Sequence, residues 1–289
     1  MTARRHGEQG MALYDREQHR SLAFLYGGHD PGVCCHMHSG VALWLLGYPT
    51  AALERSRAGL GLARDLAHPG SLANALPFMS IVQQLRGEVG AIHELAESMI
   101  ALSTAHGLSQ WLAFGRILNA WVQAEQGRGE AATAGLRRAV AEYRAGGNDL
   151  WVPCFLALLA AAYLTNGATD EGLGTVADAL ASADVTGSRL WNPEFYRLKG
   201  ELLFARDPAA APDAETAFRQ AIDVARGQSA KSWELRAALS LSRLWQRQGQ
   251  RDEARQLLQE IYGWFTEGFD TTDLKEARAL LDELSPGGR

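Results

Sequence analysis

A short stretch near the N-terminus, GHDPGVCCHMHSGVALW (residues 28–44), contains two cysteines and three histidines. Thiolate sulfur and imidazole nitrogen are ligands that zinc prefers, and they must converge on the metal as a tetrahedron at about 2.0–2.3 Å. On a helix only side chains three or four positions apart face each other, so Cys34 and His38 can meet. His36 and His38 point to roughly opposite sides. We therefore expect no complete metal site and no cofactor, with Cys34 and His38 as the only candidate ligands.

Sequence signatures of common enzyme classes are missing from the chain. It has no G-x-x-x-x-G-K-[ST] phosphate loop and no G-x-S-x-G nucleophile elbow. The nearest approach to the zinc motif H-E-x-x-H is HELAE (93–97), in which Glu97 stands where the second histidine should be. We therefore predict no catalytic residue. A metal-assisted hydrolase at Cys34 and His38 is the enzyme alternative.

Three arginines near the C-terminus are spaced to share one helix face. Arg236, Arg243 and Arg247 follow one another at intervals of seven and four. Guanidinium groups bind carboxylate and phosphate oxygens in pairs, so this face could clamp an anion. We favour a structural interpretation, because Glu194 and Glu201 hold equivalent places about forty residues earlier. These two carboxylates are expected to pair with Arg236 and Arg243.

The chain repeats itself every forty residues, and this repetition predicts the fold. Two sets of glycines and one set of tryptophans keep the same interval. They are Gly47, Gly87, Gly127 and Gly167; Gly107, Gly147, Gly187 and Gly227; and Trp111, Trp151 and Trp191. Gly249 and Trp233 lie two residues beyond the positions that the forty-residue interval predicts, and an insertion in DPAAAP (207–212) explains this shift. Such a period is typical of solenoids, in which we expect the tryptophans to pack between repeats.

Between these residues the chain has the pattern of amphipathic helices. Apolar residues recur at intervals of three and four, as in Phe114, Ile117, Leu118 and Trp121. A glycine in each short link can adopt positive φ, which ends one helix and lets the chain reverse. One position in the first helix of each pair is always small: Gly40, Ser80, Ala120, Ala160, Gly200 and Ser242. Small residues there let two helices cross closely, as in tetratricopeptide repeats lengthened from about 34 residues.

The chain resembles the long-repeat tetratricopeptide region at the C-terminus of bacterial multidomain signalling proteins. Those proteins usually carry a class III adenylate or guanylate cyclase domain and an AAA-type ATPase domain ahead of the repeats. Matching stretches cover nearly the whole chain and include ALWLLGYPTAAL (42–53), EFYRLKGELLF (194–204) and ELRAALSLSRLWQRQGQRDEARQLLQEIYGWFTEGFDTTDLKEARALLDEL (234–284). The last is the most specific. The resemblance implies a sensor or interaction region without cyclase or ATPase chemistry.

We predict a single all-α domain over residues 1–289, a right-handed α-solenoid of about six tetratricopeptide-like helix pairs. Residues 1–27 form a partial N-terminal unit, residues 33–269 the repeats, and residues 270–284 a capping helix. The apolar face of the capping helix is Leu274, Ala277, Leu280, Leu281 and Leu284.

The N-terminal unit lacks its first helix, because EQGMALYD (8–15) resembles the end of a second helix. Left uncovered, this end would expose an apolar set, namely Met11, Leu13, Leu22, Phe24 and Leu25. An exposed apolar solenoid end marks an interface. We expect it to be covered either by a homodimer partner or by the N-terminal segment folding back.

The family resemblance places the first helix of each pair on the concave side of the solenoid. The candidate groove residues are then Met37, Trp44, Asn74, Gln84, Phe114, Trp121, Arg197, Arg236, Arg243 and Arg247. Such a groove is apolar in its N-terminal half and charged in its C-terminal half, which suits an amphipathic helix or an extended peptide. We predict a non-catalytic protein- or peptide-binding scaffold of a signalling protein. A small-molecule sensor around Trp44, Phe114 and Trp121 is the alternative.

Composition narrows the class of protein further. The chain of 289 residues has a net charge of −5, so it lacks the basic excess that nucleic-acid binding needs. No stretch approaches the roughly 18 apolar residues of a membrane-spanning helix, and residues 1–30 do not resemble a secretory signal. Three cysteines, two of them adjacent, make a poor disulfide framework. We expect a cytoplasmic protein that binds neither nucleic acid nor membrane.

Overall fold

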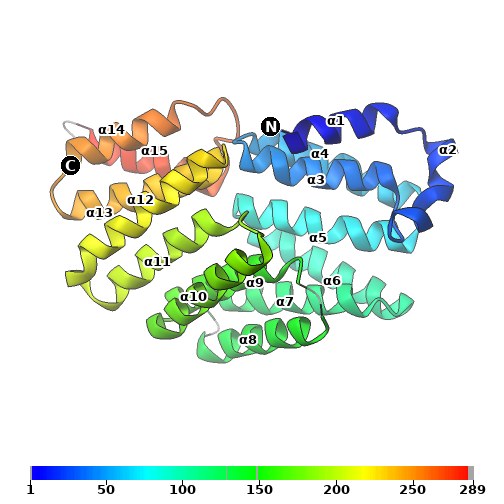
Figure 1. The fold of residues 1–289 in the computed structure, drawn as a ribbon, viewed down its shortest axis with the longest axis horizontal. Helices are drawn as coiled ribbons and strands as arrows, with labels where there is room; N and C mark the ends of the chain where they lie inside the picture. The colour runs from blue at the N-terminus through cyan, green and yellow to red at the C-terminus, as the bar shows by residue number, and fades with distance from the viewer. Residues whose placement is uncertain (1, 128, 148, 286–289) are drawn as a thin grey trace. The chain divides into compact units, whose positions relative to one another are not determined.

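The computed structural model describes residues 2–127, 129–147 and 149–285, and these residues fold almost entirely into helices (Figure 1). Helices make up 83% of the chain, and no strand occurs in the described ranges. Within each of the two units described below, neighbouring helices pack against one another along the sequence, from α3 to α6 and from α8 to α15. The predicted all-α class is therefore confirmed. The chain divides into two compact units, Met1–Val122 and Gln123–Arg289.

The first unit is a series of antiparallel helices and a 3₁₀ helix, η1. They are α1 (Thr2–Leu13), α2 (Arg16–His19), η1 (Arg20–Tyr26), α3 (Pro31–Leu45), α4 (Pro49–Asp65), α5 (Pro69–Arg86) and α6 (Val89–His106), and α7 (Ser109–Glu125) crosses the boundary between the units. α3 packs against α4 and α5, and α5 packs against α4 and α6. Proline begins α3, α4 and α5, where no helical hydrogen bond needs its missing N–H group.

The second unit continues in the same manner, with one 3₁₀ helix, η2. Its elements are α8 (Gly129–Ala145), α9 (Val152–Thr165), α10 (Thr169–Thr186), α11 (Asn192–Arg206), η2 (Pro208–Ala210), α12 (Ala211–Gly227), α13 (Lys231–Arg247), α14 (Arg251–Tyr262) and α15 (Thr272–Leu284). Each helix packs on the next from α8 to α15. In addition α9 contacts α11, α11 contacts α13, and α13 contacts α15, so alternate helices form a continuous layer.

Residues with positive φ end the helices at the predicted period. One series is Gly47, Gly87, Gly127, Gly167 and Gly249; the other is Gly27, Ala67, Gly107, Gly147, Gly187 and Ser229. The predicted insertion is present, because Asp207 is extended and η2 follows it. One position was predicted wrongly. Gly227 is the last residue of α12, and the positive φ falls at Ser229, since the insertion displaces every later turn by two residues.

Among the described residues, Ala67 is one of two non-glycine residues with positive φ, and its φ is 51°. We expect Ala67→Gly to stabilise the fold by about 0.5–1 kcal/mol, because the left-handed region costs an L-residue about 1–2 kcal/mol and the flexibility of glycine offsets part of the gain. Gly107→Ala is the matched reverse change, since Gly107 has φ 68° and nothing lies within 4 Å of an added Cβ. Urea unfolding measures both. A shift of the same sign in the two variants would refute the strain argument.

Close helix crossings occur at two of the six small positions predicted from the sequence, and Ala120 is only half-buried. A Cβ on Gly40 would lie 2.2 Å from Ser56 Oγ, and a Cβ on Gly200 would lie 2.5 Å from a ring carbon of Phe218. The same position is fully buried in three further helices, at Ser80, Ala160 and Ser242. Any larger side chain would force the paired helices apart.

The C-terminal helix α15 covers the apolar faces of α13 and α14. Leu274, Ala277, Leu280 and Leu284 are buried in one core with residues of those two helices, and Leu281 packs at its edge. Lys275 and other charged residues form the outer, exposed face of α15. The helix begins at Thr272 rather than at residue 270, and its predicted apolar face is confirmed.

At the N-terminal end, α1 folds back onto α3. Its glycines allow a close approach, because an added Cβ would lie 1.9 Å from Ser39 Oγ at Gly7 and 2.4 Å from Cys35 Sγ at Gly10. The apolar residues that the sequence predicted at this end differ in their exposure to solvent. Met11 and Leu22 are half-buried, whereas Leu13, Phe24 and Leu25 are 77%, 86% and 80% exposed.

Candidate functional site

The cysteine–histidine stretch forms most of α3, which begins after the N-cap residue Asp30. Cys34 Sγ and His38 Nδ1 lie 3.4 Å apart, as the spacing predicted, and Nδ1 is also 3.0 Å from the Cys34 carbonyl oxygen. A protonated Nδ1 donates to this carbonyl oxygen, whereas an unprotonated Nδ1 accepts from the Cys34 thiol. His36 packs toward Gly59 of α4. The histidines of this stretch therefore turn toward different neighbours.

No set of three His, Cys, Asp or Glu side chains in the described residues is arranged to hold a metal ion. Burial raises the pKa of the Cys34 thiol, and the nearby Cys35 and Asp30 raise it further. A thiol with a raised pKa stays protonated at neutral pH and is both a poor nucleophile and a poor metal ligand. The geometry and the protonation of Cys34 both favour an ordinary helix face here.

Candidate groove residues in the N-terminal half are mostly enclosed by protein. Met37, Trp44, Asn74, Phe114 and Trp121 are all buried, and Gln84 is half-buried. Met37 packs against α4, because its methyl carbon lies 2.4 Å from the position that a Cβ on Gly59 would occupy. These side chains present no open face in this structure. Their role in binding a ligand stays a prediction.

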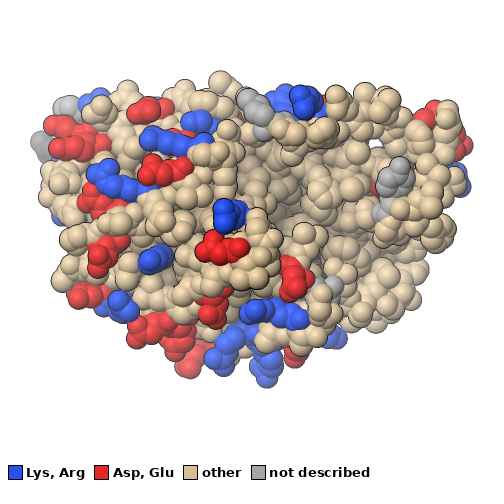
Figure 2. All heavy atoms as spheres, in the orientation of Figure 1, with Lys and Arg blue, Asp and Glu red and all other residues tan. Residues whose placement is uncertain are grey.

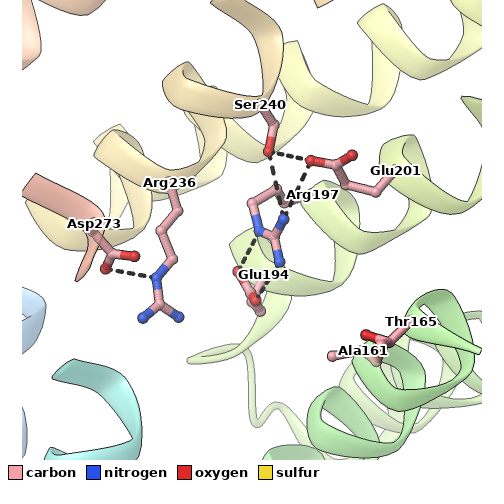
Figure 3. A network of polar contacts seen from close by, with 8 residues as sticks. All are labelled: Ala161, Thr165, Glu194, Arg197, Glu201, Arg236, Ser240 and Asp273. Carbon is pink, nitrogen blue, oxygen red and sulfur yellow. Dashed lines mark hydrogen bonds and ion pairs between the residues drawn. The ribbon is translucent and has the colours of Figure 1, made fainter. Parts of the chain in front are cut away.

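A network of charged side chains joins α11 to α13 (Figure 3). Arg197 donates to Glu194 through two parallel hydrogen bonds of 2.8 Å, from Nε and Nη2, and lies 3.5 Å from Glu201. The Ser240 hydroxyl of α13 donates to Glu201 at 2.7 Å, and Arg197 Nη1 lies 3.4 Å from the same hydroxyl oxygen. Burial raises the pKa of the Glu194 carboxyl, but Arg197 outweighs burial and holds that pKa below its ordinary value. Glu194 is therefore a buried carboxylate compensated chiefly by the guanidinium group of Arg197, with a smaller contribution from Arg236.

Two of the α13 arginines pair with α15. Arg236 donates to Asp273 at 2.8 Å, and Arg243 donates to Glu276 at 2.7 Å. Burial raises the pKa of Asp273 although Arg236 acts in the opposite direction.

The predicted pairing of Glu194 and Glu201 with Arg236 and Arg243 is wrong. Arg197 stands three residues after Glu194 and four before Glu201, so it reaches both within one helix. The α13 arginines meet acidic residues of the following helix instead. Arg247 is exposed and lies 5.3 Å from the centre of the Phe204 ring. The arginine face is thus largely engaged within the protein.

Charges of both signs are interspersed over the second unit on the face drawn in Figure 2. Neither sign of charge predominates over the second unit on this face. In the described ranges no helix has the length and apolar character needed to cross a bilayer.

The second unit has exposed apolar side chains that the sequence did not predict. Leu150 is 74% exposed before α9, and Val185 and Leu190 are 88% and 43% exposed around the loop between α10 and α11. We call these three residues the loop patch. Leu150 and Leu190 are forty residues apart, and each precedes a buried tryptophan, Trp151 or Trp191. The repeat pattern could have predicted this exposure. The buried tryptophan occupies the core position, so the leucine before it points toward solvent.

One neighbouring pair of the repeat tryptophans packs as predicted. The rings of Trp191 and Trp233 lie 5.3 Å apart, and both side chains are buried. This pair joins the start of α11 to the start of α13 and positions the loops beside it.

A Ser–His–Asp combination at the start of α5 serves as a helix cap. The Asp30 N–H donates to Ser71 Oγ at 2.9 Å, and the Ser71 N–H donates to His68 Nδ1 at 3.2 Å. The Asp30 carboxylate accepts from Tyr14 and from the Val33 N–H rather than from His68. Ser71 Oγ also lies 2.9 Å from His68 Nδ1, so these groups are bonded to one another at the start of α5.

No protein-family model matches this chain, and no curated protein matches it.

Proposed function

We propose that this chain is a non-catalytic scaffold, a right-handed solenoid of about six tetratricopeptide-like helix pairs that binds a protein or peptide. From their order in the chain we assign the pairs as α3/α4, α5/α6, α7/α8, α9/α10, α11/α12 and α13/α14, with α15 as the cap. The layer of alternate helices within each unit and the positive φ values at forty-residue intervals support this assignment. As the sequence resemblance implies, we place the scaffold in bacterial cyclase–ATPase signalling.

The engagement of the reactive side chains supports a non-catalytic role. Ser71 and His68 cap α5, and His38 bonds to the backbone of its own helix. A catalytic base must have a lone pair or a proton free for the substrate. Ser71 Oγ and His68 Nδ1 are already engaged in hydrogen bonds within the fold.

The loop patch is the observation that carries the proposal. Leu150, Val185 and Leu190 keep large apolar side chains in water although the neighbouring tryptophans are buried. Exposed apolar groups that recur at the repeat interval give a partner regularly spaced contacts, and solenoids bind through such surfaces. Leu150 and Leu190 precede α9 and α11, which contact each other, so the patch spans two repeats.

We expect the double change Leu150→Ser and Leu190→Ser to weaken partner binding by about 10- to 100-fold, since each buried apolar anchor contributes about 1–2 kcal/mol. The partner is first captured by cross-linking to the wild-type chain and identified, and its affinity is then measured by calorimetry. A cyclase or AAA-type ATPase chain among the captured proteins would support the signalling assignment.

Leu13→Ser is the matched control for this measurement, because it replaces a leucine that is similarly exposed, at 77%, in the first unit. Its affinity for the partner should equal that of the wild type. Unchanged affinity in the double leucine variant would overturn the assignment of the loop patch, provided that circular dichroism shows intact helices.

A further inference from the structure

The segment between α1 and α3 places an exposed aromatic side chain beside a cavity. Arg20, Ala23, Leu66, Ala67 and His68 line a niche of about 200 Å³, together with Asp30 and Ser71. The ring of Phe24 meets the His68 ring edge-on at 6.4 Å. The phenyl group therefore stands at the rim of the niche and not inside it, with 86% of the residue exposed.

The niche is large enough for an aromatic ring. An apolar protein cavity of about 150 Å³ accommodates benzene, so about 200 Å³ accommodates a phenyl group. Ala23, Leu66 and Ala67 supply apolar wall atoms, and His68 offers a ring face or edge. Phe24 itself is not among the residues that line the niche.

We propose that two copies of this chain associate around a two-fold axis, with Phe24 of each copy inserted into the niche of the other. A two-fold interface must be self-complementary, which requires that one surface carries both the protruding group and the cavity that receives it. The segment from Arg16 to Tyr26 meets this requirement. Leu25, which is 80% exposed, would be covered at the same interface.

Charge supports a second copy as the occupant. Glu17 and Arg20 are exposed, have opposite charges and stand three residues apart on this segment. Among the residues that the structure describes, neither takes part in an ion pair or a side-chain hydrogen bond. Around a two-fold axis, Glu17 of one copy can face Arg20 of the other, and the pairing occurs twice. Arg20 already lies at the niche, so it would meet the incoming segment.

The segment is held firmly enough to act as a docking element. Arg16 donates to the Asp65 carbonyl oxygen at 2.8 Å, which joins α2 to the end of α4. Tyr14 donates to Asp30 at 3.0 Å, and Gly70 packs against the Gly28 carbonyl, where an added Cβ would lie 2.2 Å from the oxygen. These contacts hold the segment that carries Phe24 in a fixed position beside the niche. Less conformational entropy is therefore lost when two copies associate.

Sedimentation velocity of the full chain over a range of concentrations tests the proposal. The wild type should be a dimer, and Phe24→Ser should raise the dissociation constant by about 100-fold or more, because the ring is lost from two equivalent sites. Val185→Ser is the matched control: it replaces a similarly exposed apolar residue outside the interface, and it should remain dimeric. The loop-patch variants should also remain dimeric, which separates this result from the proposed scaffold function.

A charge-swap experiment tests the geometry. Glu17→Arg and Arg20→Glu should each be monomeric, because each places like charges opposite one another. An equal mixture of the two variants should form a heterodimer, since Arg then faces Glu at both contacts. A monomeric wild type, or a dimer indifferent to Phe24→Ser, overturns the proposal. If the wild type is monomeric and Phe24→Ser abolishes binding of a different protein, the surface belongs to that partner and the dimer is refuted.

Discussion

Arg197→Met is expected to lower the free energy of unfolding by about 3–5 kcal/mol, because it leaves the buried Glu194 carboxylate without its partner. Glu194 is 7% exposed and receives two hydrogen bonds from this one guanidinium group. Methionine keeps much of the length of the side chain, so the loss is electrostatic rather than a loss of volume. Urea unfolding at neutral pH, followed by circular dichroism, measures the effect.

The effect of Arg197→Met should depend on pH. In the wild type Arg197 holds the pKa of Glu194 below its ordinary value, so the unfolded chain takes up a proton first and stability falls as the pH falls through the acid range. In the variant the pKa of Glu194 rises, because burial raises it and only the weaker effect of Arg236 still opposes burial. The variant therefore gains relative stability as the pH falls. The difference between the two proteins should be larger at pH 7.5 than at pH 5.

Two further variants control for this interpretation. Arg278→Met removes an exposed ion pair with Asp282, and it should cost no more than about 0.5 kcal/mol. Glu194→Leu combined with Arg197→Met removes both charges and should recover most of the lost stability. An Arg197→Met variant as stable as Arg278→Met would show that Glu194 is solvated or paired elsewhere.

Gly200→Val is expected to destabilise the protein by about 3 kcal/mol. An added Cβ would lie 2.5–2.9 Å from three carbon atoms of the Phe218 ring, and this rigid ring is itself buried between α11 and α12. The helices must separate or Phe218 must leave its rotamer, and either response costs packing energy throughout the crossing. Thermal unfolding of the purified variant measures the loss.

Gly174→Val is the matched control for the crossing. Gly174 lies within α10, and nothing is found within 4 Å of a Cβ built on it. Valine is a somewhat better helix former than glycine, so this variant should equal the wild type or exceed it by about 0.5 kcal/mol. Equal losses in the two variants would mean that helix propensity, and not the close crossing, governs Gly200.

Much of the fold follows from short-range patterns. The amphipathic spacing predicted the helices, and the forty-residue interval predicted the turns, because a left-handed residue between two helices is a local requirement that glycine meets best. Ala67 and Ser229 occupy the same conformation without being glycine, so only the structure could identify them. The packing of α1 against α3 was one of two arrangements that the sequence allowed.

The candidate site was less predictable than the fold. The sequence placed Arg236 and Arg243 on one helix face, but it could not select their partners. Arg197 captures both nearby glutamates within its own helix, and α15 brings Asp273 and Glu276 to α13. Each pairing depends on which charged groups lie closest in space, and a repeat with several acidic residues offers alternatives of similar energy.

The sequence by itself determined the all-α class, the forty-residue interval of the turns and the small residues at the helix crossings, because these depend on contacts within one helix pair. The tertiary structure decided which candidate side chains are buried, which ion pairs form, and where apolar groups stay exposed. Met37 is enclosed, whereas Phe24 and Leu150 are exposed, although all three are large and apolar. Whether a side chain is buried depends on neighbours that are distant from it in the sequence, and local sequence patterns do not identify these neighbours.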